Sequence, residues 1–293
     1  MINPTKFFKR SSIDKSADIL TYLDEFCELY NQRPIRDNEG GARFPHMFGL
    51  FYILKKIKPK FVIESGIWKG QSTWLIEKTL PKAKILALDV KLNKREYISK
   101  SKNVIYSNKD FKFLDQSKYN KKKTVVFFDD HQNFFERISQ CYFYGFKHII
   151  FDDNYPPNEG DCYSFKKIFS NTGVSRSFHY KWKLIILKNI LFYFIKKFFL
   201  PLKSYEVNLY DFGFSDVKPN KNIELILKKI IKEYFEFPPI FKKDIIKPNH
   251  LNKYKKFFIQ KPLLKSNSKN IKKYKFAYQD RNFYNWMTFV KLK

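Results

Sequence analysis

Two apolar runs in the middle of the chain each end in a cluster of acidic and amide side chains. Asp129 and Asp130 follow the run at 124–128, and Asp152, Asp153 and Asn154 follow the run at 147–151. Crowded carboxylates repel one another and have raised pKa values unless a cation neutralises them. Carboxylate and amide oxygens suit Mg²⁺, with water and substrate oxygens completing its shell. The alternative is that these acids cap helices and pair with the plentiful lysines.

Asp89 ends another apolar run and belongs to a repeating strand and helix pattern. Residues 61–63 predict a short buried parallel strand, followed by a loop with two glycines four apart. A helix is expected over 71–80, where a proline ends it, and a second strand over 85–88. A strand, glycine loop, helix, strand and terminal acid make a unit suited to holding a nucleoside, because the acid accepts hydrogen bonds from ribose hydroxyls.

The glycine loop differs from the dinucleotide fingerprint Gly-x-Gly-x-x-Gly, in which free amides bind a pyrophosphate. Glu64 directly follows the strand, and Gly66, Gly70 and Ser72 complete the pattern. A carboxylate there repels a phosphate but can pair with an ammonium group, which favours S-adenosylmethionine, a cationic ligand without phosphate. Residues 62–72 resemble the first motif of the class I S-adenosylmethionine-dependent methyltransferases. The alternative is a glycine turn in some other α/β protein.

The resemblance implies a set of residues that contact the methyl donor. These are Glu64, Ser65, Gly66, Trp68, Gly70, Ser72, Asp89 and Asp110. Trp68 would line the donor pocket, or else pack beneath the glycine loop. Asp110 follows the strand expected over 103–107, where this family often places a residue near the adenine; alternatively it caps a helix or is a solvated loop acid.

The two acid clusters resemble the metal-binding pattern of catechol O-methyltransferase. In that family an Asp-His after the fourth strand and an Asp-Asn after the fifth hold magnesium. The resemblance implies that Asp130, Asp153 and Asn154 are the ligands here. The sugar O-methyltransferase and cephalosporin-hydroxylase-like branch carries similar acids at these strand ends, and this pattern would recruit Asp152 instead.

The expected base differs from that of the catechol enzymes. They carry a lysine three residues after the metal-binding Asp, where this sequence has Asn133, which takes no proton at neutral pH. His131 is the nearest alternative base, acting beside Asp130, and its pKa range suits that role. The alternative for His131 is to support a metal ligand or to contact the donor. A divalent cation lowers the pKa of a bound hydroxyl by several units, so a strong base is not needed to ionise the acceptor hydroxyl.

The elements that position these residues alternate between strand and helix, which predicts an α/β protein with a doubly wound, mainly parallel, Rossmann-like methyltransferase sheet. Ligands of such sheets bind outside the carboxyl ends of the strands, where every acid cluster falls. Helices are expected over 14–31, 46–58 and 223–234. Residues 274–278 and 283–292 predict a hairpin whose last strand closes the sheet antiparallel, as in the methyltransferase fold.

The chain divides into three predicted parts. Residues 1–45 form an N-terminal helix and a flap loop, residues 46–170 with 271–293 form the S-adenosylmethionine-binding domain, and residues 171–270 form an insertion or cap. The loop within the first part, residues 33–45, contains Gly-Gly. We interpret it either as a surface connection or as a flap over the ligand, since such loops often move.

Net charge, cysteine content and hydropathy limit which binding partners and which cellular compartment the sequence suits. The formal charge of +29 attracts polyanions and anionic membrane surfaces nonspecifically, but only eight of 57 basic residues are Arg, the side chain that reads phosphates bidentately. Three cysteines without a CxxC pair suit a reducing compartment, and no signal-type stretch opens the sequence. The most apolar segment, 184–200, contains three lysines and is a poor membrane span. We therefore expect a cytoplasmic protein without a transmembrane span.

The sequence predicts an S-adenosylmethionine-dependent O-methyltransferase, assisted by Mg²⁺, that acts on a hydroxylated small molecule or a sugar. One alternative is a nucleic-acid methyltransferase. Another is a non-catalytic module that keeps the fold and binds a polyanion or membrane surface through 182–203. The enzyme hypothesis requires that Glu64, Asp89, Asp130 and Asp153 face one common cavity.

Overall fold

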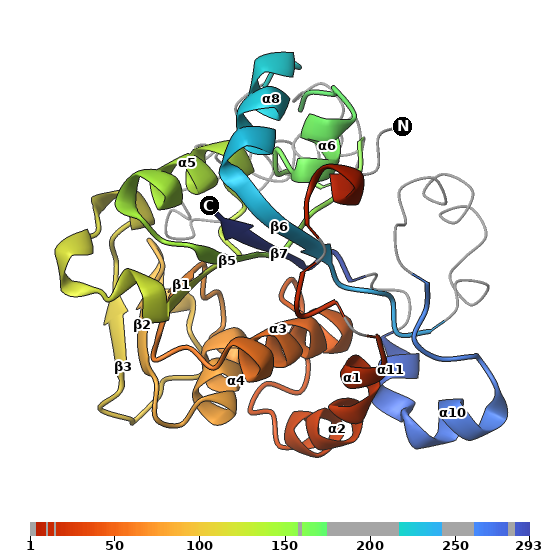
Figure 1. Cartoon of the computed structure of the whole chain (residues 1–293). Coiled ribbons are helices and arrows are strands. Elements are labelled where there is room, and N and C mark those ends of the chain that lie inside the picture. The colour runs from red at the N-terminus through yellow and green to blue at the C-terminus, as the bar shows by residue number, and fades with distance from the viewer. Residues whose placement is uncertain are drawn as a thin grey trace, which may run out of the picture.

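The computed structural model describes residues 4–9, 11–14, 16–157, 160–174, 217–241, 261–280 and 285–293. Its centre is one seven-stranded sheet (Figure 1), ordered β3-β2-β1-β4-β5-β7-β6. The strands are β1 (Phe61–Ser65), β2 (Lys84–Leu88), β3 (Val104–Ser107), β4 (Thr124–Phe128), β5 (His148–Phe151), β6 (Ile231–Glu236) and β7 (Thr288–Leu292). Neighbours among the first five strands are parallel, whereas β7 runs antiparallel to both β5 and β6. The predicted doubly wound, mainly parallel α/β sheet, closed by an antiparallel C-terminal strand, is confirmed.

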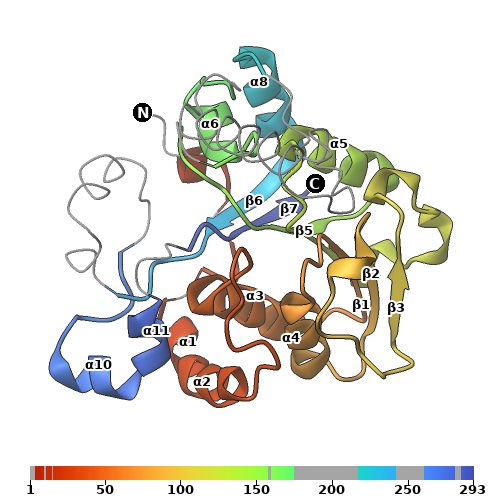
Figure 2. The same cartoon turned by 180° about the vertical axis from the view of Figure 1, so that it is seen from behind.

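Helices cover both faces of the sheet, as Figures 1 and 2 show from opposite sides. One face carries α3 (Phe44–Ile57) and α4 (Gln71–Thr79), with α1 (Ser16–Thr21), α2 (Leu23–Asn31), α10 (Ser268–Lys273) and α11 (Lys275–Gln279) farther out. The other face carries α5 (Phe134–Tyr144), α6 (Phe165–Phe169) and α8 (Lys221–Ile230). Short 3-10 helices are η1 (Pro4–Phe7), η2 (Leu92–Lys94), η3 (Phe111–Phe113), η4 (Gln116–Lys118) and η5 (Lys121–Lys123).

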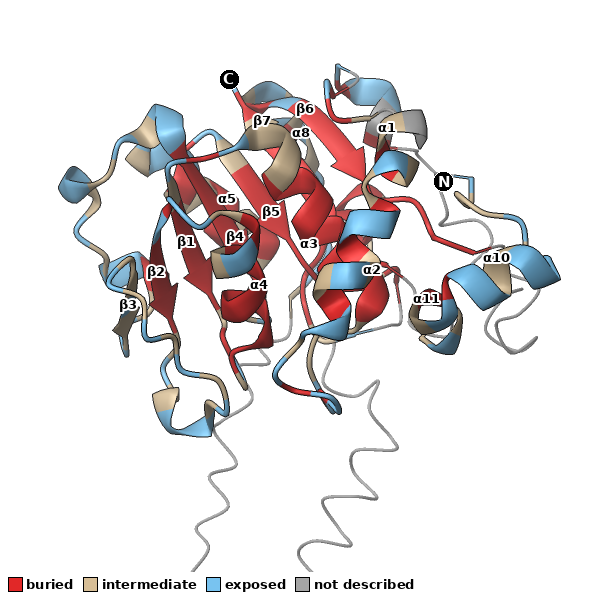
Figure 3. Ribbon diagram, turned by 90° about the horizontal axis from the view of Figure 1, so that it is seen from below, coloured by how far each residue is buried: buried red, intermediate tan, exposed pale blue. Residues whose placement is uncertain are grey.

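The central strands β1, β2, β4 and β5 are mainly apolar on both sides because both sides are covered. Val125 and Phe127 of β4 pack into the core on the α3 side, and Val126 and Phe128 into the core on the α5 side. This alternation follows from the two-residue period of a strand. Figure 3 shows the buried residues concentrated in the central strands and in α3, while β3 at the edge is more exposed.

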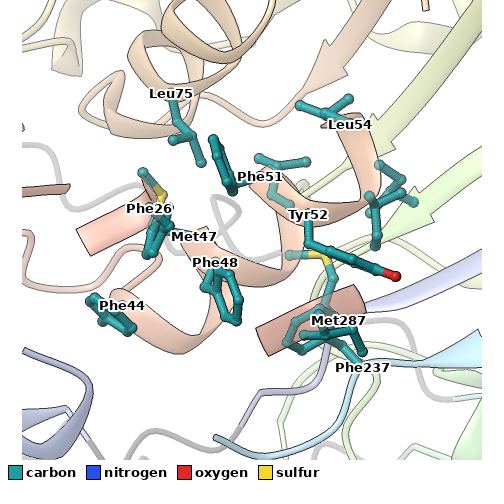
Figure 4. Close-up of a cluster of buried hydrophobic side chains, with 14 of the residues drawn as sticks. Phe26, Phe44, Met47, Phe48, Phe51, Tyr52, Leu54, Leu75, Phe237 and Met287 are labelled. Atoms are coloured by element: carbon teal, nitrogen blue, oxygen red, sulfur yellow. The ribbon is translucent and has the colours of Figure 1, made fainter. Parts of the chain in front are cut away.

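Aromatic packing fixes α3 against the sheet, and Figure 4 shows the cluster. Phe48 lies with its ring centroid 5.2 Å from that of Phe26 on α2 and 5.4 Å from that of Phe237, which follows β6. Tyr52 contacts Phe237 from the next turn, at 5.8 Å, and its hydroxyl donates to the Ile13 carbonyl. Each such aromatic pair contributes about 0.5–1.5 kcal/mol beyond its buried area. The N-terminal helices are thereby joined to the sheet domain.

Two predicted elements are wrong. Residues 274–278 are not a strand but lie in or beside α11, and β7 pairs with β5 and β6 instead of forming a hairpin with them. The helix expected over 223–234 ends at Ile230, where β6 begins. Strand β6 is therefore part of the main sheet, although its residues fall within the predicted insertion 171–270. Residues 175–216 and 242–260 of that region lie outside the described residues, so the cap stays a prediction.

In the part of the chain that the structure describes, no helix is long and apolar enough to cross a membrane. The apolar segment 184–200 and the proposed surface-binding stretch 182–203 lie outside the described residues. The three cysteines are free, with Cys141 and Cys162 buried and Cys27 half-buried.

Candidate functional site

The loops that follow β1, β2, β4 and β5 adjoin one another at the carboxyl edge of the sheet. Backbone hydrogen bonds extend the sheet beyond the last strand residues: Gly66 to Leu88 (2.9 Å), Asp89 to Ser107 (3.1 Å), Asp129 to Ser65 (2.8 Å) and Asp152 to Phe128 (2.9 Å), each written from amide to carbonyl. These loops form one continuous rim. The rim carries Gly66, Trp68, Gly70, Asp89 and the acid clusters, whereas Glu64 and Ser65 end β1, Ser72 lies in the first turn of α4 and Asp110 follows β3.

Gly66 lies where the glycine loop touches the acidic loop after β4. Its φ is +92°, and a Cβ there would lie 2.1 Å from the Asp129 carbonyl oxygen. Gly70 has φ +94° and begins α4, and a Cβ there would lie 2.6 Å from the Tyr97 carbonyl oxygen. Only glycine combines this left-handed conformation with such close backbone approach.

Asp89 holds the glycine loop in place. Its Oδ2 accepts from the amides of Ile67 (2.9 Å) and Trp68 (3.1 Å), and its Oδ1 accepts from the Lys91 amide (2.8 Å). An open hollow of about 630 Å³ adjoins it at the ends of β2 and β3. Its lining is Val90, Lys91, Leu92, Asn93, Tyr106, Ser107 and Asn108. The expected position of the ribose and adenine is thus a concave, mainly polar surface.

Glu64 does not face this hollow. It is fully buried, its Oε2 accepts from the Thr73 hydroxyl at 2.6 Å, and its Oε1 has no hydrogen-bond partner among the described residues. Burial raises the pKa of Glu64 to about 7, although hydrogen bonds from Ser72 and Thr73 oppose the shift. Glu64 and Ser72 therefore fix the first turn of α4 in this structure and do not present a carboxylate to a ligand.

Asp130 is held by a buried guanidinium. Its Oδ2 accepts from Arg137 (2.8 Å) and from the Ser65 hydroxyl (2.7 Å), and Arg137 also makes a bidentate pair with Asp110 (2.7 and 3.0 Å). Burial raises the pKa of Asp130 despite these partners, whereas Arg137 and the Lys112 amide outweigh burial at Asp110 and lower its pKa. Asp110 also caps η3. This network joins the loops after β3 and β4 to α5.

The acids that do gather are Asp129, Asp152 and Asp153, together with two histidines. Ligand atoms of Asp129, His131 and Asp153 lie within 4.8 Å of one another, and so do those of His46, Asp152 and Asp153. His46 Nδ1, at the start of α3, lies 2.7 Å from Asp152 Oδ1. Asp129 therefore lies in the acid cluster, in the place that the sequence analysis had predicted for Asp130.

Burial and mutual repulsion disfavour the charged forms of these acids. Burial, then the carboxylates of Asp152 and Asp153, raise the pKa of Asp129 well above its usual value. Burial and Asp152 raise the pKa of Asp153 to about 6. Asp153 has φ +58°, its Oδ2 makes no hydrogen bond, and that oxygen lies 3.2 Å from His131 Nδ1. Such a buried, strained and electron-rich group is a candidate cation site.

His131 lies over the acids, half exposed, with φ +54°. Its Nδ1 lies 3.1 Å from Asp161 Oδ1 as well as near Asp153, and Cys162 Sγ lies 4.0 Å away. Burial lowers the pKa of His131, but the Asp161 and Cys162 hydrogen bonds and the Asp153 charge outweigh burial and raise it well above its ordinary value. Its imidazolium form therefore balances part of the negative charge.

Asn154 turns away from the cluster. Its amide nitrogen donates to Thr288 Oγ1 (2.8 Å), Tyr234 (3.0 Å) and Glu236 (3.4 Å), and its oxygen accepts from the Lys166 amide. It is fully buried in a network that includes the Lys166–Glu236 ion pair. This arrangement connects β5 to β6 and β7, and the structure does not bring Asn154 to the predicted metal ligands.

The predicted flap loop, 33–45, packs on the glycine loop and α4. Gln71 exchanges two hydrogen bonds with the backbone of Ile35, at 3.2 and 3.1 Å. Trp68 is 43% exposed, and its indole Nε1 donates to the Glu39 carbonyl at 3.2 Å, beside Gly40. Trp68 therefore lies between the two loops and not beneath the glycine loop.

The predicted common cavity of the four acids is met only in part. Glu64 faces α4, Asp89 faces the glycine loop, Asp130 faces Arg137, and only Asp153 lies in the carboxylate cluster. Three partners were missed at the sequence level: Arg137, His46 and Asp161. His46 is encoded far from the acids, and only the start of α3 brings it there. Asp161 follows the second acid cluster closely and could have been included as a further acid of that loop.

No family model matches the sequence, and no curated protein does. A search of solved structures returned methyltransferases, the class that the sequence resembles. CmcI with SAH aligns at TM-score 0.34 and 14% identity over 39% of this chain and 62% of its own, so this chain spans less than two thirds of it. A Podospora anserina methyltransferase, PaMTH1 with SAH, aligns at TM-score 0.33 and 12% identity over 50% of this chain and 72% of its own. A putative O-methyltransferase from Klebsiella pneumoniae aligns at TM-score 0.31 and 15% identity over 46% of this chain and 65% of its own. The fold assignment above depends on the strand order and not on these alignments.

Proposed function

We propose that this chain is an S-adenosylmethionine-dependent O-methyltransferase assisted by a divalent cation. The observation that carries the proposal is the contact between two loops on one rim. The glycine loop held by Asp89 touches the backbone of Asp129, the first acid of the buried cluster, at Gly66. A donor and an acceptor bound to these two loops would be neighbours.

The donor side suits a nucleoside without phosphate. Asp89 lies between the glycine loop and the hollow after β2 and β3, and a carboxylate at that strand end accepts hydrogen bonds from ribose hydroxyls. Because Asp89 holds the loop amides in this structure, donor binding would share or exchange those hydrogen bonds. Gly66 and Gly70 allow close backbone approach. Glu64, Ser65, Ser72 and Asp110 support these loops in the present conformation, and Trp68 would contact the donor from the flap side.

The cluster residues fit a divalent cation. Asp129, Asp152 and Asp153 offer oxygen ligands, and with Asp161 they make four carboxylates against two imidazoles. Even with both imidazoles protonated, negative charge remains in excess in a buried site. Mg²⁺ favours such oxygen ligands. We assign Asp129, Asp152 and Asp153 as the ligands in place of the set Asp130, Asp153 and Asn154.

The residues of the chain have the following roles in this proposal. A bound cation would supply charge that favours ionisation of an acceptor hydroxyl. His131 is half exposed above the cluster and is oriented by Asp161. A bound cation would neutralise the acids in place of the His131 imidazolium, and the neutral imidazole would then receive the proton from that hydroxyl. Asp130 would keep the acidic loop in place through Arg137 and would not touch substrate. The acceptor would be a small hydroxylated molecule, such as a sugar or a catechol-like ring, because two adjacent oxygens are what a chelating cation selects.

The test is calorimetric titration of S-adenosylmethionine and of its demethylated product, with and without Mg²⁺, followed by turnover assays with diol and nucleic-acid acceptors. We expect Asp89→Asn to weaken donor binding by about 10-fold or more, the value of one to two charged hydrogen bonds. Asp152→Asn should abolish Mg²⁺ binding and leave donor binding nearly intact. Asp115→Asn, an exposed capping acid, is the control with the same charge change. Donor binding that is absent in the wild type, or turnover with nucleic acid only, would contradict the proposal.

A further inference from the structure

A second cavity lies at the opposite, amino-terminal edge of the sheet. It has a volume of about 410 Å³, within the size range of small-molecule sites. Its lining includes six lysines, namely Lys56, Lys58, Lys60, Lys122, Lys123 and Lys291. We propose that this cavity binds a small anion that carries several adjacent phosphate groups.

Four of the six lysines are available for a ligand. Lys58, Lys60, Lys122 and Lys123 are exposed and make no ion pair with any residue that the structure describes. The other two are partly neutralised within the protein, Lys56 by Asp18 at 3.0 Å and Lys291 by Glu233 at 3.2 Å. Four uncompensated ammonium groups around one cavity repel each other, and an anion with several charges relieves that repulsion.

The lysines are carried by rigid backbone. Lys58 ends α3 in the left-handed conformation, with φ +50°, and its amide donates to the Leu54 carbonyl. Lys60 precedes β1, and its amide donates to the carbonyl of Lys123, which precedes β4, at 2.9 Å. The two pairs of lysines are therefore held at adjacent strand starts. A preorganised site loses less entropy on binding than a pair of mobile loops.

The other lining groups agree with a positive cavity. Among the described lining residues Glu233 is the only acid; it is buried, and it already accepts from the Ser11 hydroxyl at 3.1 Å besides pairing with Lys291. Burial, then the cations of Lys291 and Lys147, lower the pKa of His148 against the opposing effect of Glu233. His148 is thus a neutral donor or acceptor at pH 7.

The cavity selects phosphates and not bases. Phe289 is buried in the core and stacks on His148, so the described part of the lining offers no exposed phenylalanine, tyrosine or tryptophan ring to a nucleobase. Binding of single-stranded nucleic acid normally uses exposed aromatic side chains for stacking. Lysine serves as a point charge for phosphate oxygens without demanding the planar geometry that arginine prefers. The site is independent of the proposed methyltransferase function, since it lies at the other edge of the sheet.

The experiment measures binding of inorganic tripolyphosphate to the full chain by calorimetry, at low salt and at about 0.15 M salt. The pocket variant carries Lys58→Gln, Lys60→Gln, Lys122→Gln and Lys123→Gln. The control variant carries the same change at four exposed lysines of the α10 and α11 region, Lys265, Lys269, Lys272 and Lys275. Both variants lose the same charge. Circular dichroism melts and S-adenosylmethionine titrations, run in parallel, report on folding and on the proposed donor site.

We expect the wild type to bind one tripolyphosphate per chain, and the pocket variant to bind about 10-fold or more weakly, because each exposed charge contributes modestly and four are removed. The control variant should keep the wild-type affinity. Equal losses in the two variants would show that binding follows net charge and would overturn the proposal. So would a wild type that does not bind tripolyphosphate, or one that binds single-stranded RNA more tightly through the same four lysines.

Discussion

Replacement of Gly66 by Ala tests the contact between the glycine loop and the acidic loop. A Cβ at Gly66 would lie 2.1 Å from the Asp129 carbonyl oxygen, 2.4 Å from its carbonyl carbon and 2.8 Å from the Asp130 amide nitrogen. Real Cβ atoms essentially never approach closer than 3.0 Å, so the two loops must separate by about 0.9 Å. The left-handed backbone, φ +92°, adds about 1–2 kcal/mol of strain for any residue with a Cβ.

The expected result follows from that displacement. A shift of about 1 Å in a positioned site costs about 100-fold, so S-adenosylmethionine binding or turnover should fall by about that factor. Gly145→Ala is the matched control, because Gly145 has φ +81° at the end of α5 but its nearest neighbour, the Lys121 side chain, is 3.9 Å away. The control should lose about 1–2 kcal/mol in urea unfolding and keep donor affinity. If both variants bind the donor equally well, the two loops are not parts of one site.

Three further predictions concern the supports of the site. Glu64→Gln removes an acid whose pKa of about 7 in the folded chain exceeds its ordinary 4.5, so the folded form binds the extra proton and wild-type stability falls as pH rises from about 4.5 to 7. Urea unfolding at pH 5 and 8 should show about 2.5 kcal/mol of this loss in the wild type and little in the variant, and an equal pH dependence in the two proteins would contradict the assignment. Arg137→Met leaves two carboxylates without their buried cation and should cost about 3–5 kcal/mol, whereas a loss below about 1 kcal/mol would refute the pairing. Gln71→Ala should raise amide hydrogen exchange in the loop 33–45 with little change elsewhere, and unchanged exchange there would show that the loop is held by other contacts.

Most of the sheet was predictable because its central strands are buried on both faces. Strands β1, β2, β4 and β5 each read as a short apolar run that ends at a polar loop and is buried, whereas the edge strand β3 is mostly half-buried. Strand β6 was missed because Leu227, Ile230, Ile231 and Tyr234 recur at helical spacing across the end of α8. Tertiary pairing with β7 overrides that local pattern. The aromatic residues 274–278 resemble a strand, yet they lie beside and within short helices that follow a capping Asn267.

The sequence predicted which residues lie along the rim of the candidate site, but not which way their side chains point. Strand ends told which acids share an edge, since the carboxyl ends of parallel strands meet there. The strand ends did not indicate that Arg137, one turn into α5, forms an ion pair with Asp130, so that Asp129 and not Asp130 lies in the acid cluster. The side chain of Glu64 similarly depends on Thr73, which packs across it from α4. Such choices are decided by packing between elements, and a single sequence carries no spacing rule for them.

The most direct measurement is a crystal structure of the chain grown with the demethylated product of S-adenosylmethionine and Mn²⁺, in which anomalous scattering locates the cation. We expect Mn²⁺ to be bound by the carboxylates of Asp129, Asp152 and Asp153, and the nucleoside to lie beside Asp89 with its sulfur directed toward that ion. A cation bound elsewhere, or a nucleoside that avoids the Gly66 and Asp89 loops, would contradict it.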